Sequence, residues 1–259
     1  MEKIYDVLVI GAGVVGAAVA DVLARYDVDV AVLEKSASAG AGTTKANSAI
    51  VHAGYDCHVG TMKAKMNVRG NAMYPALSEE LDVPFDNSGS LVVAFSEEEM
   101  ETVHALYEQG IANGCDGMEI LDAAGVKAHE PNLSDEIVGA LYSARAGVTD
   151  PFLMCMRLLD RAILNGAEVE LGAEVTGLRE EKDAIVVETT KGERKAHYVV
   201  NCAGLYSDRI MAFAGDTPIE INPTAGEYRM VEAVENPEVR SVIFQTPTKA
   251  GKGVLVARM

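Results

Sequence analysis

Cysteine is scarce in this chain. The 259 residues contain four cysteines, and no two of them form a C-x-x-C pair or stand at metal-ligand spacing from a histidine. Structural zinc and iron–sulfur sites are built from such spacings, so we expect no metal site. Scattered cysteines without a pairing pattern are typical of a reduced compartment. They predict a cytosolic chain.

Basic residues are also few. Lysine and arginine number 22 against 39 aspartates and glutamates, which gives a formal net charge of -17. A field of this sign repels phosphate backbones and anionic lipid, so we exclude a general nucleic-acid-binding role. An anionic ligand must therefore be held by local groups rather than by the overall charge.

No apolar run is long enough to cross a bilayer. The nearest candidate, residues 7–20, is too short and is bounded by Asp6 and Asp21. The residues before it are net negative, whereas a signal peptide begins with positive charge. We expect a cytoplasmic protein with no integral membrane segment, and peripheral contact with a membrane stays open.

The composition and the chain length fit a folded globular protein. Apolar residues make up 49% and charged residues 24%, which is a globular rather than a disordered balance. The length fits one large domain or two interleaved ones. Because the sequence has no repeat and no low-complexity linker, two domains would be interwoven.

The first third of the chain starts with a βαβ pattern. Ile4–Ile10 is a short run rich in β-branched residues, residues 14–25 form a small-residue helix pattern, and residues 28–33 form a second buried strand pattern. Capping and spacing signals predict further helices over residues 61–81, from Ser96 to Gly114, and from Pro151 to Gly166. Further strands are expected at residues 88–95, 167–171, 174–178, 184–189, 195–201 and 253–257.

The turn after the first strand carries a G-x-G-x-x-G motif, Gly11-Ala12-Gly13-Val14-Val15-Gly16. Its place between a strand and a helix is the setting of dinucleotide-binding turns. Gly11 permits the tight turn, Gly13 lets the backbone approach a pyrophosphate, and Gly16 lets the helix pack closely on the strand. The amides at the helix start, those of Val14 and Val15 among them, attract negative oxygen.

The residues after the second strand discriminate between nucleotide cofactors. Glu34 follows Gly16 by 18 residues and can accept hydrogen bonds from an adenosine ribose, which argues against a 2′-phosphate. This fingerprint fits NAD and FAD alike. A second loop rich in glycine, threonine and serine, residues 40–48, suits the longer ligand, whose far phosphate and flavin ring need more donors. The loop favours FAD and disfavours an NAD-dependent dehydrogenase.

A resemblance to a known family rests on this loop and its continuation. Residues 40–70, GAGTTKANSAIVHAGYDCHVGTMKAKMNVRG, resemble L-2-hydroxyglutarate dehydrogenases and oxidases and are similar to a bacterial group of glycerol-3-phosphate dehydrogenases. Both are FAD enzymes of the D-amino-acid-oxidase-like superfamily. Further matches are Glu130-Pro131 and residues 147–150, 201–208 and 226–228. The resemblance spans essentially the whole chain.

The resemblance implies an α/β fold of two interleaved domains. A Rossmann-like FAD-binding domain with a parallel sheet would comprise residues 1–75 and 145–215. A mixed-sheet α+β substrate domain would comprise residues 76–144 and 216–259. Family members run on past this point, and the strand pattern at residues 253–257 stops abruptly. We therefore expect a C-terminally truncated chain with an incomplete substrate domain.

The resemblance also assigns residues to the cofactor. Residues for the ADP half of FAD are Gly11, Gly13, Gly16, Glu34 and Lys35. Those along the pyrophosphate and flavin are Thr43, Thr44, Asn47 and Ser48. The backbone of Val175 would meet the adenine, and Ala203 and Gly204 would approach the cofactor from a second strand end.

His52 is the catalytic candidate, because it directly follows the flavin loop. A neutral imidazole can remove a hydroxyl proton while hydride leaves carbon, and a hydrogen-bonded structural histidine is the alternative reading. An anionic substrate needs a cation. The candidates are Lys63, Lys65, Arg69 and Arg229, of which Arg229 is favoured because it follows a Gly-Glu-Tyr motif.

The expected function is hydride transfer from a small anionic hydroxy compound to FAD. Glycerol 3-phosphate and L-2-hydroxyglutarate are the leading substrate classes, and a quinone, a carrier protein or oxygen would reoxidise the flavin. Amino-acid or amine oxidation on the same scaffold is the second enzyme reading. The non-enzyme reading is a truncated, inactive FAD-binding fragment.

Overall fold

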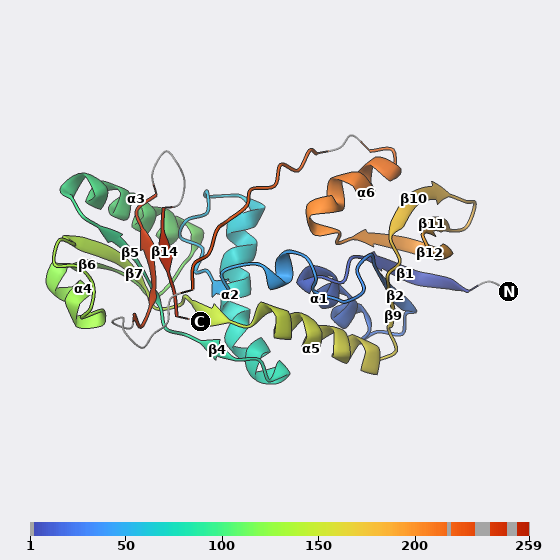
Figure 1. Cartoon of the computed structure of the whole chain (residues 1–259), viewed down its shortest axis with the longest axis horizontal. Helices are drawn as coiled ribbons and strands as arrows, with labels where there is room; N and C mark the ends of the chain where they lie inside the picture. The colour runs from blue at the N-terminus through green and yellow to red at the C-terminus, as the bar shows by residue number, and fades with distance from the viewer. Residues whose placement is uncertain (1–2, 217–218, 231–238, 248–252, 259) are drawn as a thin grey trace. The chain divides into compact units, whose positions relative to one another are not determined.

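The chain divides into two compact units, each made of two separate stretches of sequence. The computed structural model describes residues 3–216, 219–230, 239–247 and 253–258. Unit 1 comprises residues 1–47 and 151–227, and unit 2 comprises residues 48–150 and 228–259. Each unit is built around its own sheet (Figure 1). The two units are therefore interwoven along the chain.

Unit 1 contains a six-stranded sheet in the order β10-β11-β12-β1-β2-β9. Strands β12, β1, β2 and β9 run parallel, and β10 and β11 extend the sheet as antiparallel strands. The strands are β1 (Ile4–Ile10), β2 (Val30–Glu34), β9 (Glu168–Leu171), β10 (Val175–Glu180), β11 (Ile185–Thr189) and β12 (Gly192–Asn201). The helices are α1 (Val14–Leu23), α5 (Pro151–Leu164) and α6 (Ser207–Phe213), with the short 3-10 turns η1 (Thr43–Lys45) and η2 (Gly204–Tyr206).

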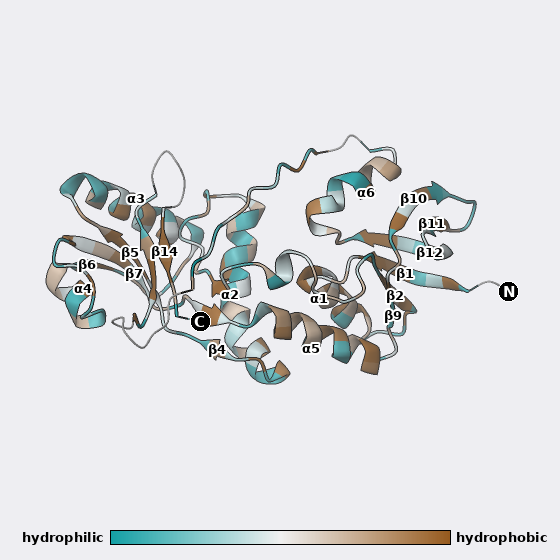
Figure 2. Ribbon diagram, in the orientation of Figure 1, coloured by the Kyte–Doolittle hydropathy of each residue, from teal (hydrophilic) through white to brown (hydrophobic). Residues whose placement is uncertain are grey.

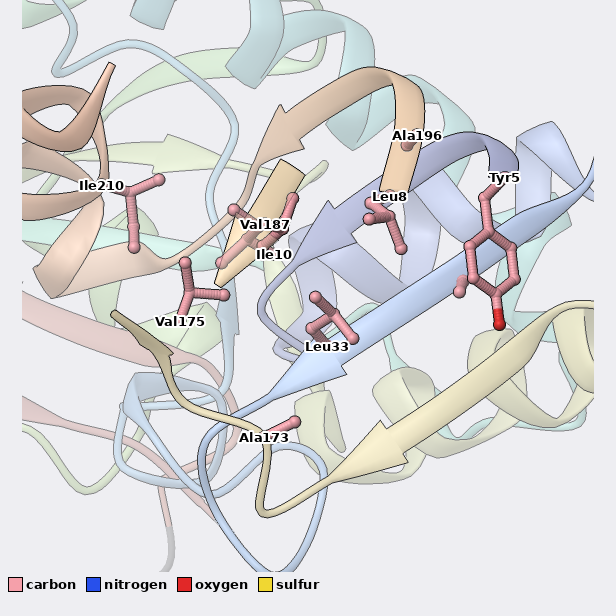
Figure 3. Packing of buried hydrophobic residues seen from close by; sticks show 10 residues of the cluster. Tyr5, Leu8, Ile10, Leu33, Ala173, Val175, Val187, Ala196 and Ile210 are labelled. Carbon is pink, nitrogen blue, oxygen red and sulfur yellow. The ribbon is translucent and has the colours of Figure 1, made fainter. Parts of the chain in front are cut away.

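The core of unit 1 follows from the apolar strand sequences. Leu8, Ile10 and Leu33 are buried beside Val187 and Ile210, as Figure 3 shows. Helices α1 and α5 pack against each other. Helix α5 buries a stripe of residues at spacings of three and four, which is the pattern of an amphipathic helix. These residues are Met154, Cys155, Leu158, Leu159 and Ala162.

A buried ion pair links α1 to α5. The Asp21 carboxylate is almost fully buried and accepts hydrogen bonds from both Nε and Nη2 of Arg161, the latter at 2.8 Å. Arg25 donates to the same carboxylate at 2.9 Å. Burial alone would raise the pKa of Asp21, but the hydrogen bonds from Arg161 and Arg25 outweigh it and hold that pKa below its ordinary value. The pair therefore stabilises the fold in its ionised form.

We predict that Asp21→Asn lowers the free energy of unfolding by about 3 kcal/mol at pH 7, because Arg161 loses its buried partner. Since the folded pKa lies below the unfolded one, the stabilisation is complete above about pH 4 and is lost as pH falls through the folded value. Urea titrations at pH 7 and at pH 3.5 should show the difference from wild type shrinking at the lower pH.

The matched control is Asp116→Asn, which breaks the exposed bidentate pair between Asp116 and Arg145. Solvent screens that pair, so its loss should change stability much less. Equal losses from the two substitutions would contradict the role given to the Asp21 pair.

Unit 2 contains a five-stranded mixed sheet in the order β14-β13-β5-β7-β6 and a small sheet in the order β3-β8-β4. The strands are β3 (Ile50–Val51), β4 (Phe85–Asp86), β5 (Ser90–Ala94), β6 (Met118–Asp122), β7 (Gly139–Ser143), β8 (Gly147–Thr149), β13 (Val242–Gln245) and β14 (Leu255–Val256). The helices are α2 (Met62–Leu81), α3 (Glu97–Asn113) and α4 (Ala123–His129). Figure 2 shows β5 mostly in the hydrophobic colour, and all five of its residues are buried.

The helix boundaries in unit 2 follow the capping signals. The Ser96 hydroxyl accepts from the Glu99 amide at 3.2 Å, and Gly114 ends α3 in the left-handed region at φ 82°. Thr61 caps α2 in the same way, through the Ala64 amide. The expected helices over residues 61–81 and after Ser96 are therefore confirmed.

The boundaries of the compact units differ from those expected for the domains. Residues 48–75, which we expected in the nucleotide-binding domain, group with unit 2, because Ala53 and Tyr55 lie in its core and α2 contacts α3. Parts of the expected substrate domain lie outside the described residues. Which ligand each domain binds stays a prediction. Among the described residues, no helix combines the length and apolar character needed to cross a membrane.

Candidate functional site

The carboxyl ends of three neighbouring strands meet at the glycine-rich turn. Strands β12, β1 and β2 are adjacent and parallel in the unit 1 sheet. The Gly11 amide donates to the Leu33 carbonyl at 2.8 Å, and the Cys202 amide donates to the Ile10 carbonyl at 2.8 Å. Open α/β sheets bind ligands at this edge. The turn is therefore in the position that the motif predicted.

Packing within the protein explains two of the three motif glycines. Gly11 has φ 105°, and a Cβ there would lie 2.5 Å from the Cys202 carbonyl oxygen. A Cβ on Gly16 would lie 1.9 Å from the Gly11 carbonyl oxygen. Both distances are far below van der Waals contact. Only glycine therefore lets the turn after β1 approach both the turn after β12 and helix α1 this closely.

At Gly13, packing within the fold does not require a glycine as strictly as at Gly11 and Gly16. Gly13 lies at the N-cap of α1 with φ -76° and ψ 176°, a conformation open to any residue. Beyond its own helix and chain neighbours, a Cβ there would meet one atom of the described residues within 4 Å, the Thr44 hydroxyl oxygen at 3.3 Å. The space beside Gly13 therefore fits a group that approaches the start of α1 from outside, and this position suits a pyrophosphate.

Glu34 ends β2 beside the same turn. Its two carboxylate oxygens accept hydrogen bonds from the Ala12 amide at 2.9 Å and the Ser36 amide at 2.8 Å. These bonds fix the carboxylate at the strand end. Because a carboxylate offers about four lone-pair positions, each oxygen can still accept from a ribose hydroxyl.

The second glycine-rich loop lies against the start of α1. The Gly40 amide donates to the Ala12 carbonyl at 2.9 Å, and the Val14 amide donates to the Thr44 hydroxyl at 3.0 Å. Asn47 donates from its side chain to the Thr43 and Thr44 carbonyls. The buried Thr44 and the half-buried Asn47 thus shape the loop, whereas Thr43 is exposed.

Three expected residues lie in the remaining part of unit 1. Ala203 and Gly204 form the turn after β12, and the Ala203 amide donates to the Asn201 side chain at 3.2 Å. Val175 begins β10, and its side chain lies in the core. The role of its backbone toward an adenine stays a prediction.

An aromatic ring that we did not predict as a site residue lies beside this edge. The Lys35 ammonium lies 3.1 Å from the centroid of the Tyr206 ring, and the Arg209 guanidinium lies 5.2 Å from it. Tyr206 belongs to the matched segment 201–208, and that match was the one available signal for it. The contact is a cation–π interaction and fixes Lys35 next to Glu34.

His52 belongs to unit 2 and follows strand β3. Its carbonyl accepts a hydrogen bond from the Asn71 side chain at 3.1 Å. Its ring stacks on Phe244 of β13, with ring centroids 5.8 Å apart and an interplanar angle of 29°. Sequence reasoning missed Phe244, because no strand was predicted around it. Ser48 also falls in unit 2, directly after the loop.

The candidate substrate cations lie on the surface of unit 2. Lys63, Lys65 and Arg69 are exposed on α2, and Arg229 is exposed in an irregular stretch. The structure brings none of these four into an ion pair with another described residue. No cluster of three or more His, Cys, Asp or Glu side chains suited to a metal occurs in the part of the chain that the structure describes.

Comparison with known sequences identifies related proteins. The sequence model described as "FAD dependent oxidoreductase" matches residues 6–259. The glycerol 3-phosphate dehydrogenase of Caloramator mitchellensis is 44% identical over 97% of this chain, which spans 52% of that protein's length. The L-2-hydroxyglutarate dehydrogenase of Escherichia coli strain K12 is 32% identical over 98% of this chain, which spans 61% of its length.

Comparison with solved structures agrees with the sequence matches. The dithionite-reduced L-alpha-glycerophosphate oxidase from Mycoplasma pneumoniae, with FAD bound, has a TM-score of 0.86 and 28% identity. The alignment covers 99% of this chain and 69% of that one. The expected α/β fold is therefore confirmed.

Proposed function

Because the chain belongs to the family of FAD dependent oxidoreductases, we propose that unit 1 binds the ADP half of FAD at the carboxyl ends of β1, β2 and β12. This membership confirms the resemblance stated from the sequence, and FAD as the cofactor of the family. The space beside Gly13 is the observation that carries the proposal, since among the described residues only the Thr44 hydroxyl, at 3.3 Å, comes close to a Cβ placed there. The N-terminus of α1 next to Gly13 and the Glu34 carboxylate, fixed by the Ala12 and Ser36 amides, support it.

The proposed contacts divide along the cofactor. The pyrophosphate lies beside Gly13 at the start of α1, where it accepts from the Val15 amide and replaces the Thr44 hydroxyl as the acceptor of the Val14 amide. Glu34 accepts from the ribose. Lys35 lies near the adenosine, and Val175 meets the adenine through its backbone. The remaining contacts toward the pyrophosphate and flavin come from Thr43, Thr44, Asn47, Ser48, Ala203 and Gly204.

We propose that the substrate is a small anionic hydroxy compound of the glycerol 3-phosphate or L-2-hydroxyglutarate class. One relative is named for the first of these substrates and another for the second, and both names support this substrate class. Bound FAD supplies an acceptor for the hydride that leaves the hydroxyl-bearing carbon. His52 takes the hydroxyl proton as a neutral imidazole, so the products are a carbonyl compound and a protonated histidine.

The proposal extends to the substrate cations and the electron acceptor. Arg229 and Lys65 bind the substrate's phosphate or carboxylate, because the net charge of -17 makes local cations necessary. A quinone, a carrier protein or oxygen then reoxidises the flavin. The protein acts in the cytoplasm.

We predict that the purified chain carries a flavin chromophore, which heating releases as FAD. The measurement is a visible absorbance spectrum before and after heating, followed by a titration with added FAD. A colourless protein that also fails to take up FAD would contradict the binding proposal. A panel of glycerol 3-phosphate, L-2-hydroxyglutarate and amino acids with a dye acceptor then tests the substrate class, and turnover of amino acids alone would favour the amine reading.

A further inference from the structure

The backbone around Lys35 is fixed at the carboxyl edge of the unit 1 sheet. The Ala173 amide donates to the Glu34 carbonyl at 2.8 Å, and the Glu34 carboxylate accepts from the Ser36 amide at 2.8 Å. The Gly172 amide donates to the Ser36 carbonyl at 2.9 Å. Lys35 therefore lies between two tied residues, directly after the acid that we assign to the ribose.

The turn that carries Tyr206 is tied to the end of strand β12. Asn201 is the last residue of that strand, and its side chain accepts from the Ala203 amide at 3.2 Å and donates to the Ser207 carbonyl at 2.8 Å. Between these residues, the Tyr206 amide donates to the Ala203 carbonyl at 3.0 Å. The bonds close the turn on both sides of Tyr206 and fix the point from which its ring extends.

The two segments meet at the Tyr206 ring. The Lys35 ammonium lies 3.1 Å from the ring centroid, and the Arg209 guanidinium lies 5.2 Å from it. Since β2 and β12 flank β1 in the sheet, the contact between Lys35 and Tyr206 spans the carboxyl end of β1, where the glycine-rich turn begins. In the part of the chain that the structure describes, neither cation is paired with a carboxylate. All three side chains are exposed, so an anionic ligand can reach both cations from solvent.

This contact adjoins the segment that we assign to the adenine. Ala173, whose amide bonds to the Glu34 carbonyl, stands two residues before Val175. Helix α6 directly follows Tyr206 and contacts β10, the strand that Val175 begins. Ile210 of α6 and Val175 share one buried cluster (Figure 3). The ribose acid, the cation–π contact and the adenine segment therefore lie around one place at the sheet edge.

We propose that Tyr206 is a positioning residue for Lys35, and that the pair recognises the ADP half of the cofactor. The inference rests on the proposed binding of FAD by unit 1. A lysine side chain loses rotamer freedom when it binds a ligand, and a contact that holds it beforehand lowers this cost. Tyr206 holds the ammonium beside Glu34, so that Lys35 donates to an oxygen of the ADP half while Glu34 accepts from the ribose.

The first test measures binding and needs no turnover. The full chain, stripped of flavin, is titrated with ADP and with FAD in a calorimeter. Tyr206→Leu should weaken both ligands by the same factor, about 3- to 30-fold, which is the range of cation–π interactions from exposed to desolvated sites. Tyr206→Phe should bind both within about twofold of wild type, because a phenylalanine ring also attracts a cation. The control is Tyr198→Leu, which removes an exposed tyrosine of β12 and should change neither affinity. Wild-type ADP affinity in Tyr206→Leu would overturn the proposal.

The second test asks whether Tyr206 acts through Lys35. Lys35→Met changes an exposed side chain and should weaken ADP binding at least as much as Tyr206→Leu does. Adding Tyr206→Leu to Lys35→Met should cause no further loss, because the ring then has no ammonium to hold. Normal ADP binding by Lys35→Met, or losses that multiply in the double variant, would overturn the positioning role alone. A wild-type chain that binds neither ADP nor FAD would overturn the proposed function, and the inference with it.

Discussion

Gly13→Ala should leave the chain folded and weaken FAD binding by at least about 100-fold, which corresponds to about 2.7 kcal/mol. Beyond its own helix and chain neighbours, the added methyl group meets one atom among the described residues, the Thr44 hydroxyl oxygen at 3.3 Å, and a small shift of that side chain accommodates it. The backbone of Gly13 already has a conformation open to alanine. The same methyl group occupies the space that we assign to the pyrophosphate. Flavin content after purification and an FAD titration followed by fluorescence give the affinity, and thermal unfolding without FAD gives the stability.

Substitutions at two other glycines serve as controls for the Gly13→Ala result. Gly16→Ala should prevent correct folding, since its methyl group would collide with the Gly11 carbonyl oxygen. Gly70 lies inside α2, and beyond that helix no atom of the described residues lies within 4 Å of a methyl group added there. Gly70→Ala should keep full flavin binding while favouring the helix. If Gly13→Ala bound FAD as tightly as Gly70→Ala does, the pyrophosphate would have to lie elsewhere.

His52→Gln should lower kcat by about 10²- to 10⁴-fold, the contribution typical of a positioned base. Glutamine is close in size to histidine and keeps a polar group, but it cannot take a proton at neutral pH. Flavin content should stay at the wild-type level, because His52 belongs to unit 2 and the ADP half is assigned to unit 1. Anaerobic mixing with glycerol 3-phosphate, followed by the loss of flavin absorbance, measures the chemical step without an external acceptor.

The control for this substitution is His104→Gln, which changes an exposed histidine on α3. It should leave the rate of flavin reduction unchanged. A His52→Gln variant that reduced its flavin at the wild-type rate would leave His52 as a structural histidine packed on Phe244.

The part of the fold that sequence predicted best is the part fixed by local rules. The run Ile4–Ile10 became β1 with the bounds expected, and the helix after Ser96 ends at Gly114 as its capping residues indicate. Strands β3 and β4 have two residues each, too short for any periodicity to be seen. The parallel pairing of β13 with β5 joins distant parts of the chain, and no local pattern encodes it.

In the candidate site, too, sequence predicted the residues that follow a local rule and missed those that depend on distant contacts. Gly11, Gly13 and Glu34 have a fixed spacing with a physical reason, and the structure brings them to one sheet edge. Tyr206 and Phe244 act through contacts with residues far away in sequence, Lys35 and His52. An aromatic residue has many uses in a core, so its type alone does not identify either contact.

The pairing of β1 with β12 also has a consequence for biosynthesis. Ile4 lies opposite Lys195, so a ribosome adding about 5 to 20 residues per second makes the partner strand roughly 10 to 40 s after β1. During that interval β1 can pair with β2 but its other edge lacks β12, and an apolar strand with an open edge readily associates with other chains. Non-local parallel pairing is also slow to form. The yield of folded protein in a cell should therefore depend on chaperones that shield β1 until residues 192–201 have left the ribosome.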